Sequence, residues 1–221
     1  MVPIILKREN SSDIRLSIEE FRNDFLTVCQ THHSERRALV FAFLLYDFDN
    51  PNISQILRNP DYWTALDYLS GKYLSIFYIH TKNEKLFNEK EFSPVFYDML
   101  PVIGRESPFK ESKTILEKYF GIDSSLKLPS ILFFQVKENY VSNYLFVELK
   151  SNTLEPLFNE LMDTVKEVVE SLKNVRKEYY ENYDEVFDVI KTTIRNKKEL
   201  KFITKVIKKI PITKILDWIL S

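Results

Sequence analysis

The chain has 221 residues, of which 44% are apolar and 14% aromatic, so it can build a packed core and is not a disordered polymer. Its single cysteine, Cys29, excludes a disulfide framework, and its three glycines exclude most glycine-rich phosphate-binding loops. No apolar run reaches the ~18 residues of a transmembrane helix, and the apolar part of the amino terminus is too short for a secretory signal. We therefore expect a cytoplasmic protein.

The charge is unevenly distributed along the sequence. Residues 191–214 contain nine basic residues and one acid, Glu199, so this segment carries +8 and leaves −9 for the rest of a chain whose net charge is −1. An acidic body followed by a basic segment indicates that the segment has a partner of its own.

Hydrophobic periodicity and turn residues predict most of the secondary structure. Ser17 and Glu20 form a capping box, and an uninterrupted apolar run that starts at Ala38 is typical of a buried strand. The expected elements, in chain order, are a helix over about 17–30, a strand over 38–46, a helix over 60–71, a strand over 73–80, loops and short turns over 81–108, a helix over 110–120, and an antiparallel hairpin formed by strands 130–136 and 141–149.

The last third is helix-permissive, since it has no Gly or Pro from Leu157 to Ile210. Apolar residues recur there at spacings of three and four. One reading is a single long helix that projects and pairs. The other is a helix on the sheet followed by two shorter helices, with a break at Asn182 or at 192–198. We favour the broken version, because polar residues at both places suit helix junctions.

The element order resembles the thioredoxin-like fold over about residues 35–172. The local residues that carry the resemblance are Gly121-Ile-Asp and Lys127-Leu-Pro129-Ser-Ile-Leu-Phe-Phe134, because the family places a cis-proline directly before its third core strand. Pro129 is therefore the candidate cis-proline. The resemblance implies an α/β (α+β) fold with a four-stranded mixed sheet flanked by helices. It divides the chain into a domain over 1–172, with an insertion around 81–108, and a basic amphipathic helical extension over 173–221.

The residues that carry thiol chemistry in that family are missing here. Thioredoxin-like oxidoreductases place Cys-x-x-Cys after the first core strand, whereas residues 48–55 contain no cysteine. We expect Cys29 to be a buried structural thiol and the protein to be redox-inactive. Cys29, His32 and His33 lack the second pair of ligands that a zinc site needs, so no metal or other cofactor is predicted.

Asp47 and Asp49 form the one motif that points to an enzyme. The Asp-x-Asp pattern after an apolar strand resembles that of haloacid-dehalogenase-type phosphotransferases, which use Mg²⁺ between the two carboxylates. Asn50 and Pro51 replace the usual small turn, and no later strand ends in an acidic pair. We interpret both aspartates as turn and helix-capping residues, with a Mg²⁺-dependent phosphotransferase as an alternative.

The carboxy-terminal segment is the strongest functional feature of the sequence. A helix over 200–210, ended by Pro211, would place isoleucines on one stripe and lysines mostly on the remaining face. Such a helix packs on its own domain, docks on a protein partner or a second copy, or lies on an anionic membrane. Nucleic acid is disfavoured, because Phe202 is the one aromatic residue interleaved with the lysines. The candidate partner- or membrane-binding residues are Lys197, Lys198, Lys201, Ile203, Lys205, Ile207, Lys208, Lys209 and Trp218.

Taken together, these features predict a non-catalytic binding or scaffold module that acts through protein–protein contacts, as a subunit of a larger complex. A peripheral membrane protein anchored by residues 197–220 is the second hypothesis, and the phosphotransferase is the third.

Overall fold

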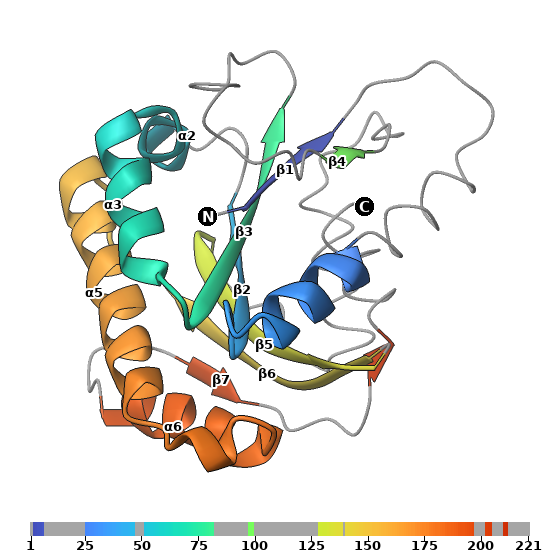
Figure 1. Ribbon diagram of the computed structural model, residues 1–221. Helices are drawn as coiled ribbons and strands as arrows, with labels where there is room; N and C mark the ends of the chain where they lie inside the picture. Colours follow the sequence, from blue (N-terminus) through green and yellow to red (C-terminus); the bar gives the residue numbers. More distant parts are fainter. Residues whose placement is uncertain are drawn as a thin grey trace.

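The computed structural model describes residues 2–6, 25–46, 51–81, 97–99, 128–138, 140–196, 202–204 and 210–211 (Figure 1). Residues 25–34 are helical. The other elements, in chain order, are β1 (Val2–Leu6), β2 (Val40–Leu45), α2 (Pro51–Arg58), α3 (Pro60–Ser70), β3 (Leu74–Thr81), β4 (Tyr97–Met99), β5 (Ser130–Lys137), β6 (Tyr140–Glu148), α5 (Leu154–Lys173), a 3-10 turn η1 (Lys177–Tyr179), α6 (Tyr183–Asn196), β7 (Phe202–Thr204) and β8 (Ile210–Pro211).

The described strands form one mixed sheet in the order β4-β1-β3-β2-β5-β6-β7, and β8 also pairs with β6. β4, β1, β3 and β2 run parallel to one another. β5 runs antiparallel to β2 and forms an antiparallel hairpin with β6. The four predicted strands are thus the continuous centre of the sheet, β3-β2-β5-β6. The predicted α+β class, with a mixed sheet and flanking helices, is confirmed.

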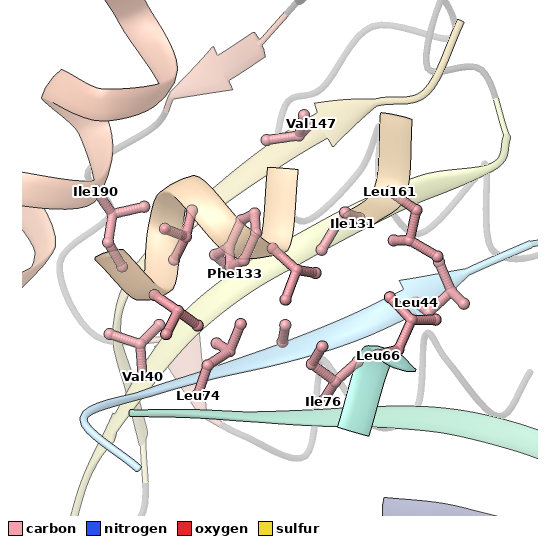
Figure 2. Packing of buried hydrophobic residues seen from close by; sticks show 14 of the residues in the cluster. Val40, Leu44, Leu66, Leu74, Ile76, Ile131, Phe133, Val147, Leu161 and Ile190 are labelled. Atoms are coloured by element: carbon pink, nitrogen blue, oxygen red, sulfur yellow. The ribbon is translucent and has the colours of Figure 1, made fainter. Parts of the chain in front are cut away.

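Helices cover the central strands on both faces, which explains their uninterrupted apolar runs (Figure 1). On one face, aliphatic side chains of the strands pack against α2, α3, α5 and α6. Figure 2 shows Leu66 of α3, Leu161 of α5 and Ile190 of α6 gathered with strand residues such as Val40 and Phe133. Each large side chain buried here stabilises the fold by about 1.5–3 kcal/mol.

The opposite face of the sheet is aromatic and lies against helix 25–34. The ring of Phe25 lies 4.8 Å from that of Phe77 and 5.4 Å from that of Phe43, centroid to centroid. Phe43 in turn stacks on Phe134 at 5.4 Å. We call these strand rings, together with that of Phe41, the aromatic face.

The α3 helix begins and ends at the residues that the sequence indicates. The Asn59 side chain accepts a hydrogen bond from the Asp61 amide at 2.9 Å, and Pro60 occupies the first turn. Gly71 ends the helix with φ of 54°, in the left-handed region that favours glycine. The helix α2, directly before it, was not expected from the sequence.

The last third contains separate helices, as we favoured. The chain leaves α5 at Lys173 and re-enters a helix at Tyr183, and the Asn182 side chain accepts a hydrogen bond from the Glu185 amide at 3.4 Å. α6 ends at Asn196, inside the second predicted break. Four residues of α6 are buried in the same core as α3 and α5: Val186, Phe187, Ile190 and Ile194.

The predicted helix over 200–210 is wrong at the residues that the structure describes there. Phe202–Thr204 and Ile210–Pro211 are strands that pair antiparallel with β6. The edge of β6 offers unpaired backbone donors and acceptors, and the Phe-Ile-Thr sequence of β7 suits an extended strand. The predicted helix over 110–120 and most of the expected loops over 81–108 lie outside the described residues. The helix predicted over 17–30 is described from residue 25 onward and continues to residue 34.

Candidate functional site

The basic segment, which the sequence singles out, is largely outside the described residues. Lys197, Lys198, Lys201, Lys205, Ile207, Lys208, Lys209 and Trp218 belong to that part. Ile203 lies in β7, where it is paired with Phe146 of β6. Because residues 202–204 form a strand, Ile203 is not part of an apolar stripe on a helix.

The candidate cis-proline, Pro129, lies directly before β5. The Leu128–Pro129 peptide bond is cis. The amide of Leu149, just past the end of β6, donates to the Pro129 carbonyl at 2.9 Å. Pro129 therefore lies at the end of the β5–β6 ladder, directly beyond the Ser130–Glu148 pair.

The candidate catalytic pair, Asp47 and Asp49, also falls outside the described residues. Within the described ranges, no group of three or more His, Cys, Asp or Glu side chains is arranged to hold a metal ion. The same residues include no helix that is both long enough and apolar enough to cross a membrane.

Cys29 is buried, with 1% of its surface exposed, on the side of helix 25–34 that meets the sheet. Burial raises the pKa of its thiol well above the usual value, because a thiolate loses its hydration there. The thiolate is the reactive form of cysteine, so this thiol is suppressed as a nucleophile. The prediction of a buried thiol is confirmed.

His32 joins the end of helix 25–34 to the sheet. Its ring Nδ1 is hydrogen-bonded to the Ser75 hydroxyl of β3 at 2.8 Å, and the residue is 7% exposed. Its carbonyl accepts hydrogen bonds from the amides of Arg37 at 2.7 Å and Ala38 at 3.1 Å, just before β2 begins. Burial, and then the positive charge of Arg37, lower the pKa of His32 from 6.5 to about 4. The ring is therefore neutral at pH 7.

His33, on the next position, faces a different group of side chains. Its ring stacks on Tyr183 with centroids 5.4 Å apart, and its Nε2 lies 3.4 Å from the Tyr183 hydroxyl and 3.5 Å from a Glu181 carboxylate oxygen. The Lys137 ammonium lies 5.9 Å from the centre of the same tyrosine ring. Burial, first of all, raises the pKa of the Tyr183 phenol, which keeps it protonated. This cluster connects helix 25–34, the β5–β6 turn and α6.

A chain of hydrogen bonds links the buried side chains of Gln135 and Asn143 to the exposed carboxylate of Asp184 on α6. The Asn143 amide donates to the Gln135 side-chain oxygen at 3.2 Å and to the Asp184 carboxylate at 3.1 Å. Gln135 donates onward to the Leu39 carbonyl at 3.4 Å. These bonds fix α6 against β5 and β6, so we assign them a structural role.

One exposed tyrosine and several half-buried apolar side chains lie on α3 and α5, which run side by side (Figure 1). Tyr68 of α3 is 85% exposed. On the same two helices, the rings of Tyr62 and Phe158 stack with centroids 4.2 Å apart, and Leu69 and Met162 are also half-buried. We call these five residues the α3–α5 face.

Sequence reasoning missed this surface. It assigned Tyr62, Leu66 and Leu69 to the inward side of the helix, and this is confirmed: Leu66 is buried, and Tyr62 and Leu69 are half-buried against the core. The signal that could have found the surface is Tyr68, because a tyrosine one position before Leu69 falls outside the inward stripe.

Comparisons with protein-family models, with curated proteins and with solved structures find no match for this chain.

Proposed function

We propose that this chain is a redox-inactive, thioredoxin-like binding module that acts in the cytoplasm through protein–protein contacts, as a subunit of a larger complex. The observation that carries the proposal is the 85% exposure of Tyr68 on the α3–α5 face.

The thioredoxin-like part of the proposal is supported by the order and direction of the strands. The parallel set β1-β3-β2 is followed by the antiparallel β5-β6 hairpin, with helices over both faces of the centre. Redox inactivity is supported by the cysteine content, because the single cysteine is Cys29 and its thiol is buried at a helix–sheet contact.

The binding part is supported by the chemistry of the α3–α5 face. Tyrosine offers a large apolar ring, a polar tip and few rotatable bonds, so it is enriched at protein interfaces and among the residues that dominate binding energy. Tyr68 extends from a helix that is fixed at both ends by caps and on its inner side by Leu66. The ring is thus presented on a rigid support, which lowers the entropy lost on binding.

Affinity purification of the tagged full-length chain from its native cell tests this function. We expect a stoichiometric partner with the wild type, at least a tenfold loss of that partner with Tyr68→Ser, and full recovery with Asp188→Ser. Asp188 is a matched control on α6, since its side chain is also well exposed, at 68%. Equal recovery of partners with all three chains, or no partner with the wild type, would contradict the proposal.

Cell fractionation tests the location separately. We expect the chain in the soluble fraction at low and at high salt. Recovery with membranes at low salt and release at high salt would instead favour a peripheral membrane protein, because that pattern is typical of basic segments on anionic lipid.

A further inference from the structure

Helix 25–34 covers the aromatic face of the sheet, and a buried histidine near its end is hydrogen-bonded to β3. Phe25, Leu26, Val28 and Cys29 are buried along the helix. At its carboxyl end the contact changes from apolar to polar, where His32 is hydrogen-bonded to Ser75 of β3 at 2.8 Å. The same residue's carbonyl accepts the amides of the turn that leads into β2. His32 thus holds together the helix end, the turn and β3.

The groups that face His32 would stabilise an imidazolium poorly. Its hydrogen-bond partner Ser75 is neutral and itself buried, and Cys29, one turn earlier, is a neutral thiol. Arg37 of the turn opposes a positive charge, and the chain's amino group does so more weakly. Among the described residues, the acid that favours a positive charge on the ring is Glu35, but its carboxylate is half-exposed and lies 3.6 Å from the Arg37 guanidinium.

We propose that His32 is an acid-sensitive latch: protonation of its ring releases the end of helix 25–34 from β3 and uncovers the aromatic face, while the rest of the fold stays intact. A buried cation without a close counter-ion is costly, whereas the released ring is hydrated. The helix can open separately because, among the described polar contacts at this end, those of Gln30 and His33 are exposed or half-buried and the one fully buried bond is that of His32 to Ser75.

The change of the opening equilibrium with pH follows from the difference between the pKa of the His32 ring in the open helix and in the closed helix. The ring has a pKa of 6.5 when hydrated and about 4 when buried. The opening equilibrium therefore rises about tenfold from pH 7 to pH 5.5 and about 100-fold from pH 7 to pH 4. The apolar contacts of Phe25, Leu26 and Val28 still favour the closed helix, so the open form stays a minor population and is best measured by a rate.

Cys29 is a built-in reporter for this opening, because it is the only thiol in the chain and is 1% exposed. The probe is 4,4′-dithiodipyridine, a thiol reagent that remains reactive in acid. Its rate with the full-length chain is divided by its rate with free cysteine at the same pH. We expect this ratio to rise about 100-fold from pH 7 to pH 4 in the wild type.

Two histidine variants separate the latch from general acid effects. In His32→Gln the ratio should change less than about threefold over the same range, because no group at the contact titrates. In His33→Gln, which removes the neighbouring histidine, the full rise should remain. An unchanged ratio in the wild type, or an equal rise in His32→Gln, would overturn the proposal.

Hydrogen exchange of the wild-type chain tests the same idea without a variant, and so holds even if His32→Gln fails to fold. After correction for intrinsic rates, amides of residues 25–34 should exchange faster at pH 4 than at pH 7, whereas those of α5 should not. If α5 accelerates in step with the helix, the opening is global unfolding and the latch is wrong.

Discussion

Phe187→Ala tests whether α6 belongs to the core of the domain. The Phe187 side chain is fully buried among the residues that α6 shares with α5 and the sheet, and the Lys191 ammonium lies 5.8 Å from its ring centroid. Removing the ring loses its burial and leaves a cavity, which together cost about 3–5 kcal/mol in other cores. The lost contact with the lysine adds about 0.5 kcal/mol. We therefore expect the free energy of unfolding to fall by about 4 kcal/mol.

Urea unfolding followed by circular dichroism measures this change. With a slope of about 2 kcal/mol per M, the midpoint should fall by about 2 M and the slope should stay the same. Asp188→Ala is the control on the next residue. Because the Asp188 carboxylate of its ion pair with Lys191 is 68% exposed, we expect a change below about 1 kcal/mol. A change below about 1 kcal/mol in Phe187→Ala, or a separate early transition in the wild type, would refute the placement of α6 in this core.

Three further predictions concern single contacts. The pKa of His32 is lower in the folded chain than in the unfolded one, so its contribution to stability is complete above pH 6.5 and is lost as the pH falls toward 4. The wild type should lose about 3 kcal/mol more than His32→Gln between pH 7 and pH 4 in chemical unfolding, and equal losses would contradict this. Glu160→Ala removes a carboxylate that accepts the Lys150 amide at 2.9 Å, and should lower the unfolding free energy by about 2 kcal/mol; no change would show that this contact is not stabilising. Trp63→Phe removes a 2.9 Å hydrogen bond to the Tyr78 hydroxyl and should cost about 1–2 kcal/mol by thermal unfolding, whereas a neutral result would contradict the bond.

The elements that could be predicted from the sequence are those fixed by local patterns. The apolar run that starts at Ala38 forms a strand that is buried on both faces of the sheet. A helix on the surface would instead alternate apolar and polar residues, so the run itself indicates the strand. Pro60 and Gly71 mark the limits of α3 because their backbone preferences suit a helix start and stop. Asn182 marks the start of α6 for the same kind of reason.

The features that could not be predicted depend on partners distant in the sequence. Residues 200–210 have the isoleucine and lysine pattern of an amphipathic helix, but within them β7 pairs with the edge of β6, and this pairing decides its conformation. α2 is eight residues long, too short for periodicity to reveal. The bond between His32 and Ser75 joins residues 43 positions apart.

Site-specific photo-cross-linking in the native cell tests the central claim most directly, because it reports contacts of the α3–α5 face as they occur. A benzophenone amino acid replaces Tyr68 in one chain and Asp188 in another. We predict one dominant cross-linked protein from position 68 and none above background from position 188. Equal products from both positions, or no product from position 68 in a chain that is folded and expressed, would contradict a binding module that works through this face.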